Sequence, residues 1–296
     1  MDTTTNTAMK TKAFNIPPVP SVLLAIISAQ SGAAIAKSLF PMLGPATTAS
    51  LRIGISALIL FITFRPNLFK LNIVQWKAAM FYGLSLGVMN ITFYYAITRI
   101  PIGLGVTLEF IGPLLLAVLG SKRLVDFVWI ILAGTGIVLI SPLTSQNGAD
   151  TIGILLALLA GAFWAIYIIT GSKISKVMKD GEAVSVGMLF ATILILPFGI
   201  ASAGFAQITP KFLLLGTALA LLSSAIPFVL EMKALRKLPK RTFSILMSLE
   251  PAIAALCAWL FLNETLTIKE CFAIILVIAA SMGATSRSGG GHPISQ

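Results

Sequence analysis

Ten apolar stretches, each long enough to cross a lipid bilayer as a helix, take up most of this 296-residue chain. About 20 residues, at about 1.5 Å of rise each, cross a hydrocarbon core about 30 Å thick. With 57% apolar and 10% charged residues and a mean hydropathy of +0.97, the composition excludes a water-soluble domain. We expect an all-α polytopic membrane protein with transmembrane helices at 19–37, 46–64, 76–97, 101–120, 125–141, 152–172, 182–204, 212–235, 242–262 and 268–286.

The N-terminal residues, the two cysteines and the single histidine further limit what the protein can be. Residues 1–18 are polar, and no small-residue cleavage site follows them, so the first apolar helix is expected to be retained. Cys257 and Cys271 fall inside expected helices, which indicates buried thiols and no disulfide framework. The one histidine, His292, lies in the polar C-terminal tail, so we expect no metal site and no cofactor.

The positive charge gives the expected topology. The net charge is +11, but the basic residues are spread along short loops and form no single patch, so we expect no nucleic-acid partner. With the N-terminus in the cytoplasm, 16 of the 21 Lys and Arg residues fall at the inner face. Cytoplasmic loops carry such an excess. Both tails, 1–18 and 287–296, are therefore expected in the cytoplasm.

The two halves of the chain resemble each other at an offset of 138 residues. The identities pair Ala96, Pro101, Leu108, Pro113 and Ala117 with Ala234, Pro239, Leu246, Pro251 and Ala255. Five helices per half is an odd number, so the second copy must be upside down. The loop at 98–101 accordingly carries one basic residue and its counterpart at 236–241 carries four. We expect two inverted five-helix repeats, 19–145 and 146–286, with a substrate site between them near the midplane. A chance likeness between apolar helices is the alternative.

Longer strings resemble a known family. "GVTLEFIGPL", "GAFWAIYII", "LPKRTFSILMSLEPA" and "LNETLT" are similar to EamA-type members of the drug/metabolite transporter superfamily, most of all to bacterial threonine/homoserine exporters. The resemblance runs from about residue 20 to residue 285. It implies an inner-membrane exporter of small neutral amino acids that is driven by proton antiport. The small multidrug pumps of this superfamily carry a key glutamate in their first helix, whereas this chain has Gln30 and, near the outer end, Lys37. That difference argues against the same cation-exchange mechanism.

Four ionisable residues lie inside expected helices and away from the helix ends: Arg52, Glu109, Glu231 and Glu250. A charge at the centre of a membrane helix costs roughly 2.5–3.5 kcal/mol on insertion scales, so each needs a partner. Glu109 is either a static ion pair with Arg52 or a group that meets substrate or proton, and Glu250 has the same alternatives. A carboxylate in a low-dielectric cavity can act as a proton carrier near neutral pH. Glu231 is close in sequence to the basic loop at 236–241, and we expect a salt bridge there.

A zwitterionic amino acid needs a cation for its carboxylate and an anion or an aromatic face for its ammonium group. Arg52 and Glu109 supply both. The other candidates for substrate binding are polar or aromatic residues that interrupt apolar helices: Gln30, Lys37, Asn90, Tyr94, Trp164 and Tyr167. Their alternatives are structural: Lys37 can snorkel to the surface, Asn90 can bond a neighbouring helix, and the rings can simply pack.

Two prolines follow the carboxylates of the fourth and ninth expected helices. Pro113 and Pro251 each remove a backbone hydrogen bond, at positions 109 and 247 respectively. Both are hinge candidates, with a fixed kink as the alternative.

Competing functions leave different marks on a sequence. No HExxH string is present, and no expected helix contains a histidine, so we do not expect an enzyme. Efflux of another metabolite or drug and passive flow through a channel remain open, because one fold serves many substrates. The expected partners are an amino acid, the proton and membrane lipid, and the protein is expected as a monomer or a homodimer.

Overall fold

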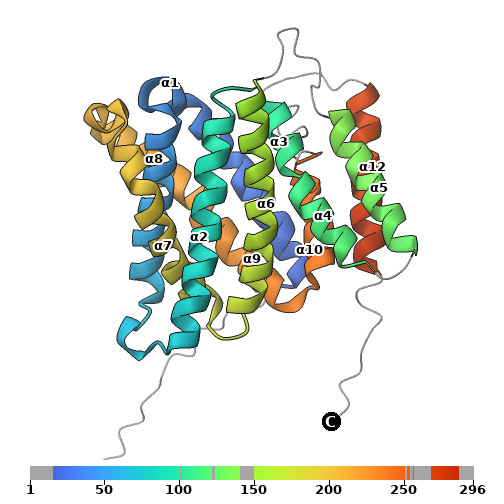
Figure 1. The fold of residues 1–296 in the computed structure, drawn as a ribbon, viewed down its shortest axis with the longest axis horizontal. Coiled ribbons are helices and arrows are strands. Elements are labelled where there is room, and N and C mark those ends of the chain that lie inside the picture. The colour runs from blue at the N-terminus through green and yellow to red at the C-terminus, as the bar shows by residue number, and fades with distance from the viewer. Residues whose placement is uncertain are drawn as a thin grey trace, which may run out of the picture.

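A computed structural model describes residues 16–100, 102–121, 124–140, 150–250, 252–253, 256 and 268–286. Throughout this part of the chain the regular structure is helical, and the helices pack side by side as a bundle (Figure 1). The elements in chain order are α1 (Pro18–Phe64), η1 (Leu68–Lys70), α2 (Ile73–Ala96), α3 (Ile102–Glu109), α4 (Ile111–Leu119), α5 (Leu124–Ile140), α6 (Thr151–Ile174), α7 (Asp180–Ile200), η2 (Ala203–Gln207), α8 (Pro210–Ala220), η3 (Leu221–Ala225), α9 (Ile226–Lys237), α10 (Lys240–Met247) and α12 (Ile268–Ser286).

Several of these helices are long and apolar enough to cross a membrane, as the sequence predicts. By length and composition these are Leu39–Phe64, Thr151–Ile174, Asp180–Ile200 and Pro210–Lys237. Shorter apolar helices cover Pro18–Gly32, Leu124–Leu139 and Cys271–Ala280. The protein is therefore a polytopic, all-helical membrane protein. Much of the ninth expected helix, 242–262, lies outside the described residues.

The first two expected helices form one element, α1, with a break inside it. Gly44 has a positive φ of 73°, which glycine adopts without a steric penalty, and Pro41 and Pro45 flank it. The chain folds back at this point, because the parts on either side of Gly44 both contact η3. Ser28 Oγ donates to the carbonyl of Leu222, and Ser56 Oγ donates to the carbonyl of Ala220.

Two further helix breaks fall where the prolines predict them. Pro113 has no N–H for the carbonyl of Glu109, and α3 ends at Glu109 before α4 begins at Ile111. In the second half α10 ends at Met247, four residues before Pro251, which itself lies outside the described residues. Whether either break bends during function stays a prediction.

Helix contacts follow a regular scheme. α2 packs on α6 and α7, while the run from α8 through η3 to α9 packs on both parts of α1. α4 contacts α6 and α10, and α5 contacts α12. The closest approach is between α4 and α6, where a Cβ on Gly112 would lie 1.8 Å from the carbonyl oxygen of Gly161. Only glycine permits this contact between backbones.

Several connections at one end of the bundle carry basic residues, whereas the α7–α8 connection at the other end carries none. Those joining α1 to α2, α6 to α7 and α9 to α10 lie at the lower end of Figure 1, and the α7–α8 connection lies at the upper end. The lower connections contain Arg65, Lys70, Lys176 and Lys179, whereas residues 201–209 at the upper end contain no basic residue. This is the pattern expected if the lower end faces the cytoplasm. The orientation itself stays a prediction.

One prediction about the cysteines is wrong. Cys271 is exposed on the outside of α12, not buried between helices. A thiol is apolar enough to face lipid, so sequence alone does not separate the two positions. Cys257 lies outside the described residues.

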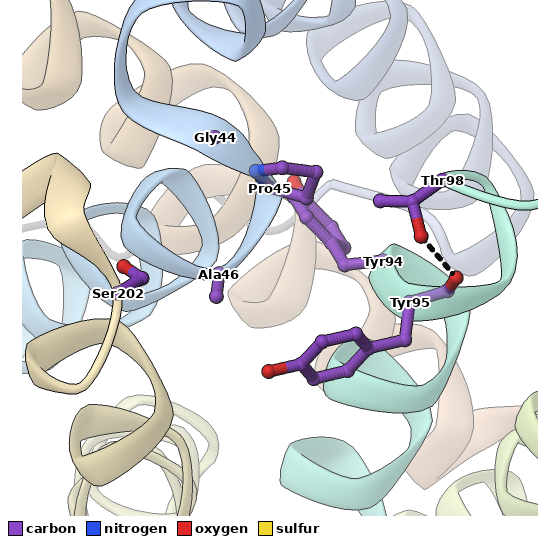
Figure 2. Close-up of a pocket in the computed structure, with 7 residues that line it drawn as sticks. All are labelled: Gly44, Pro45, Ala46, Tyr94, Tyr95, Thr98 and Ser202. Atoms are coloured by element: carbon purple, nitrogen blue, oxygen red, sulfur yellow. Dashed lines mark hydrogen bonds between the residues drawn. The ribbon is translucent and has the colours of Figure 1, made fainter.

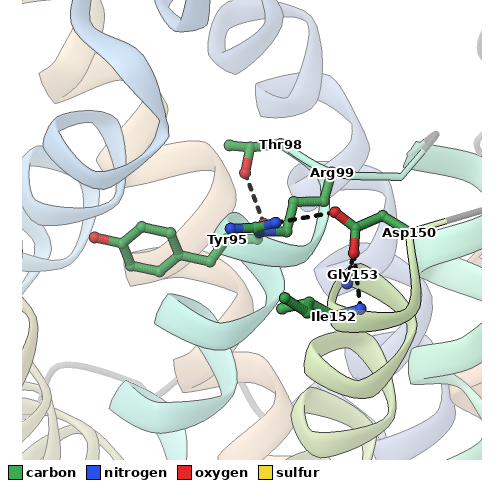
Figure 3. Close-up of polar contacts among 6 residues, drawn as sticks. All are labelled: Tyr95, Thr98, Arg99, Asp150, Ile152 and Gly153. Carbon is green, nitrogen blue, oxygen red and sulfur yellow. Dashed lines mark hydrogen bonds and ion pairs between the residues drawn. The ribbon is translucent and has the colours of Figure 1, made fainter.

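The upper end is fastened by an ion pair at the start of α6 (Figure 3). Asp150 is the N-cap residue and accepts from the backbone N–H of Ile152 at 2.8 Å. Arg99, just beyond α2, donates to the same carboxylate at 2.9 Å. The Arg99 hydrogen bond, followed by that of the Ile152 N–H, holds the pKa of Asp150 below its ordinary value.

Replacing Gly112 tests the contact between α4 and α6. Gly112→Ala should lower the thermal unfolding midpoint in detergent, because the added methyl group meets the Gly161 carbonyl and overpacking costs about 1–3 kcal/mol. Gly134→Ala in α5 is the matched control, since the nearest atom to its new Cβ is Leu114 Cδ1 at 3.7 Å. Equal midpoints for the two variants would contradict this account of the packing.

Asp150→Asn tests the ion pair through its pH dependence. Asparagine still caps a helix, so the variant mainly loses the charge facing Arg99 and should unfold at a lower temperature at neutral pH. The pKa of Asp150 is lowered by folding, so its contribution is present above the ordinary value of 3.8 and is lost as the pH falls through the folded pKa. Thermal midpoints of the two proteins should therefore converge in acid. A constant gap at every pH would rule this out.

Candidate functional site

Buried and half-buried polar side chains from both halves of the chain form a polar column through the bundle. We define the polar column as Gln30, Arg52, Asn90, Tyr94, Glu109, Tyr167, Ser223, Glu231 and Glu250. In the first half they come from α1, α2 and α3. In the second half they come from α6, η3, α9 and the segment just after α10.

Arg52 is held by neutral groups. Its Nη2 donates to Asn90 Oδ1, and its Nη1 donates to the carbonyl of Ser223 at 3.1 Å. The guanidinium lies 5.4 Å from the centroid of the Tyr94 ring. Its Nε is buried and has no hydrogen-bond partner among the described residues. A guanidinium with a free donor and no anion in contact is well suited to receive a carboxylate.

The Ser223 carbonyl is available because of Pro227. Pro227 lies four residues further on and has no N–H to return to this carbonyl, and the backbone here forms the π-helical turn η3. Side chains of α1 satisfy the exposed carbonyls of this turn. The signal that could have identified the site was a pair of serines, Ser223 and Ser224, shortly before a proline within an apolar helix.

The midplane carboxylates interact with Arg52 at longer range. Glu109 is 9% exposed and sits at the break between α3 and α4, while Glu250 accepts a hydrogen bond from Gln30 Nε2 at 3.1 Å. The charges of Glu250 and Arg52 both act on Glu109. Among the described residues, no ion pair within 4.0 Å joins Arg52 to Glu109. The structure thus brings these residues together without forming the static pair considered from the sequence.

The expectation for Glu231 is wrong. Its side chain is 6% exposed and accepts a hydrogen bond from Tyr167 Oη at 2.8 Å, and no ion pair within 4.0 Å joins it to the basic loop in the part of the chain that the structure describes. In that loop Arg236 instead pairs with Asp180 at 2.6 Å, and Arg241 pairs with Asp126. Glu231 lies on the face of α9 that turns toward α6, so nearness in sequence to the loop was misleading.

The remaining candidates are distributed along the bundle. Trp164 packs edge-on against Phe110, the residue after Glu109, with ring centroids 4.7 Å apart. Tyr167 contacts Glu231 and not Arg52. Pro113 is buried in α4. The side chain of Lys37 lies outside the described residues, as does Pro251.

A pocket of about 200 Å³ reaches the polar column from the upper end (Figure 2). It is bordered by Gly44, Pro45 and Ala46 at the break in α1, by Tyr94, Tyr95 and Thr98 at the end of α2, and by Ser202. Tyr94 lines this pocket and also contacts the Arg52 guanidinium. One aromatic ring therefore separates the pocket from the cation.

Comparison with known proteins agrees with this architecture. The family model of the EamA-like transporter family matches residues 151–286. The threonine/homoserine exporter RhtA of Salmonella typhimurium (strain LT2) is 46% identical over 270 residues, which cover 90% of this chain and 91% of that protein. The exporter of the same name from Escherichia coli (strain K12) is 44% identical with the same coverage.

More distant proteins share the fold. The uncharacterized transporter YvbV of Bacillus subtilis (strain 168) is 27% identical over 80% of this chain and 81% of its own. A solved crystal structure with 16% identity superimposes with a TM-score of 0.74 over 92% of this chain and 98% of that one. With relatives of 44–46% identity along nine-tenths of its length, the chain belongs to the EamA-like transporter family.

Proposed function

We propose that the protein exports small neutral amino acids resembling threonine or homoserine from the bacterial cytoplasm, by alternating access and in antiport with protons. The relatives named as threonine/homoserine exporters support the direction and the substrate class. Apolar membrane-spanning helices support a place in the inner membrane.

Arg52 is the observation that carries this proposal. It is a cation inside a membrane bundle, held by an amide, a backbone carbonyl and an aromatic ring, and no anion contacts it among the described residues. The carboxylate of an amino acid would supply that anion. Asn90 positions the guanidinium, and its own Nδ2 donates to the carbonyl of Leu86 at 2.8 Å. Tyr94 covers the side toward the pocket.

The acidic members of the polar column suit the other end of a zwitterion. Glu109 acts electrostatically with both Arg52 and Glu250, so an ammonium group between the two carboxylates would relieve their mutual repulsion. Protons can relieve it equally well. The two carboxylates thus bind either the substrate ammonium group or protons, one after the other, and this alternation is the physical basis of antiport. We assign the coupling to Glu109 and Glu250.

The helix contacts support two structurally equivalent halves. If the halves are equivalent, α2 corresponds to the α8–α9 run, α4 to α10, and α6 to the first part of α1. The contact of α2 with α6 then has its counterpart in the contact of the α8–α9 run with α1, and the contact of α4 with α6 in that of α10 with α1. The contacts of α4 with α10 and of α5 with α12 map onto themselves. Rocking of one half against the other, with hinges at Pro113 and Pro251, would open the column alternately to each side.

Counterflow in proteoliposomes tests the substrate assignment. Vesicles preloaded with unlabelled threonine should accumulate labelled threonine, and external homoserine should compete more strongly than dissimilar amino acids, at each of two pH values. Accumulation against a gradient distinguishes a carrier from a channel. If no amino acid of the panel competes, the assignment falls.

Arg52→Gln tests the role of the guanidinium. Losing a charge-assisted hydrogen bond to the substrate carboxylate should weaken the affinity for threonine about tenfold to a hundredfold, measured as the half-saturating concentration in counterflow. Lys211→Gln, at an exposed position on α8, is the control and should leave affinity unchanged. Normal affinity in a well-folded Arg52→Gln protein would reject the assignment.

A further inference from the structure

A third buried carboxylate, beyond the Arg52 cluster, has its own set of partners. Glu231 on α9 accepts from Tyr167 Oη at 2.8 Å, and the Tyr167 ring packs on those of Tyr82 and Phe228 with centroids 5.2 and 5.9 Å away. Tyr82 and Tyr167 are at most 1% exposed. Glu231 is thus enclosed by aromatic rings. Binding a zwitterion requires Arg52 and the carboxylates near it, and it does not require this third carboxylate.

The polar column contains more carboxylates than cations, and this bears on whether Glu231 binds a proton. Within the polar column there are three carboxylates, Glu109, Glu231 and Glu250, and one cation, Arg52, and the charge of Glu250 acts on Glu231. No cation contacts Glu231 among the described residues, and its one strong donor is a neutral phenol. An ionised carboxylate is costly to enclose in this way, whereas a proton removes the cost without requiring added space.

The position of Glu231 connects the midplane with the lower end. It lies six residues before Lys237, the last residue of α9, which corresponds to about 9 Å along the helix axis. Glu250 lies ten residues beyond Lys240, the first residue of α10, and is therefore farther from the lower end than Glu231, and its charge acts on Glu231. The carboxylates therefore follow one another from the midplane toward the end that carries the basic connections.

We propose that Glu231 carries the coupling proton between Glu250 and the cytoplasmic side, a role that rests on the proposed proton antiport. In the transfer an O–H bond on Glu250 breaks and one on Glu231 forms, and release of the proton to cytoplasmic water restores the Glu231 carboxylate. Tyr167 is a positioning residue: its hydroxyl donates to the carboxylate and fixes its rotamer.

The neighbouring elements add few other titratable groups. α6 contributes Tyr167, which in turn contacts Tyr82 of α2, and the segment after α10 contributes Glu250. On α7 the acidic residues lie at the N-terminal end, where Asp180 pairs with Arg236 and Glu182 with Lys179. α1 contributes Arg52, which acts on Glu109 and Glu250.

Glu231→Gln in proteoliposomes separates proton transfer from substrate binding. Accumulation of labelled threonine driven by an imposed pH gradient should fall about a hundredfold, the order of a lost proton-transfer group, whereas threonine counterflow without a gradient should persist. Glu182→Gln is the matched control and should keep both activities. Tyr167→Phe should shift the pH profile of accumulation, because the hydroxyl that positions the Glu231 carboxylate is lost.

Three outcomes would contradict the proposal. Gradient-driven accumulation at the normal level in Glu231→Gln, or loss of counterflow together with accumulation in a folded protein, would overturn the role of Glu231. A wild-type protein that exchanges threonine but ignores the pH gradient would overturn both the coupling and this inference.

A second measurement needs no transported substrate. Dicyclohexylcarbodiimide modifies protonated carboxyl groups in apolar surroundings, so wild-type protein should be labelled at Glu231, less so as the pH rises from about 5 to about 9, as found by mass spectrometry of peptides. Absence of labelling across that range would overturn the proposal even if threonine proves not to be the substrate.

Discussion

Every backbone carbonyl inside a bilayer must find a partner within the protein, and this requirement shapes the centre of the molecule. Pro227 leaves the carbonyl of Ser223 without its helical N–H, and Arg52 donates to that carbonyl. The guanidinium is consequently held in the bundle without an acidic partner. This contact joins the two halves of the chain, while the hydrogen bond to Asn90 and the Tyr94 ring complete the surroundings of the guanidinium.

The same requirement explains why the acidic residues gather at helix breaks. Glu109 ends α3 because Pro113 removes a hydrogen bond, and the opened backbone packs against Gly161, where a Cβ would lie 2.5 Å from the Glu109 carbonyl oxygen. Glu250 follows the corresponding break after α10 and is bonded by Gln30 from α1. Interrupted helices thus place carboxylates and opened backbone groups inside the bundle.

The polar groups inside the molecule change in kind from the upper end to the lower end. The pocket at the upper end reaches Tyr94, the Arg52 cluster follows, the midplane carboxylates come next, and Glu231 with its tyrosines lies nearest the lower end. Arg52 and the carboxylates thus lie at successive levels along the axis. Such an order suits the exchange of an amino acid for protons that we propose.

Sequence patterns alone determined the helical class, the approximate spans, the breaks at positions 109 and 247 and the family, because apolar length and proline chemistry are local properties. They also singled out Arg52, Asn90 and Glu109. The tertiary structure decided the partners: Arg52 bonds Asn90 and Ser223 instead of Glu109, Glu231 turns inward to Tyr167 instead of outward to the basic loop, and Cys271 faces outward. Partner choice depends on the rotation of each helix about its axis, and that rotation is set by close contacts between distant residues, such as Gly112 with Gly161, which no local pattern records.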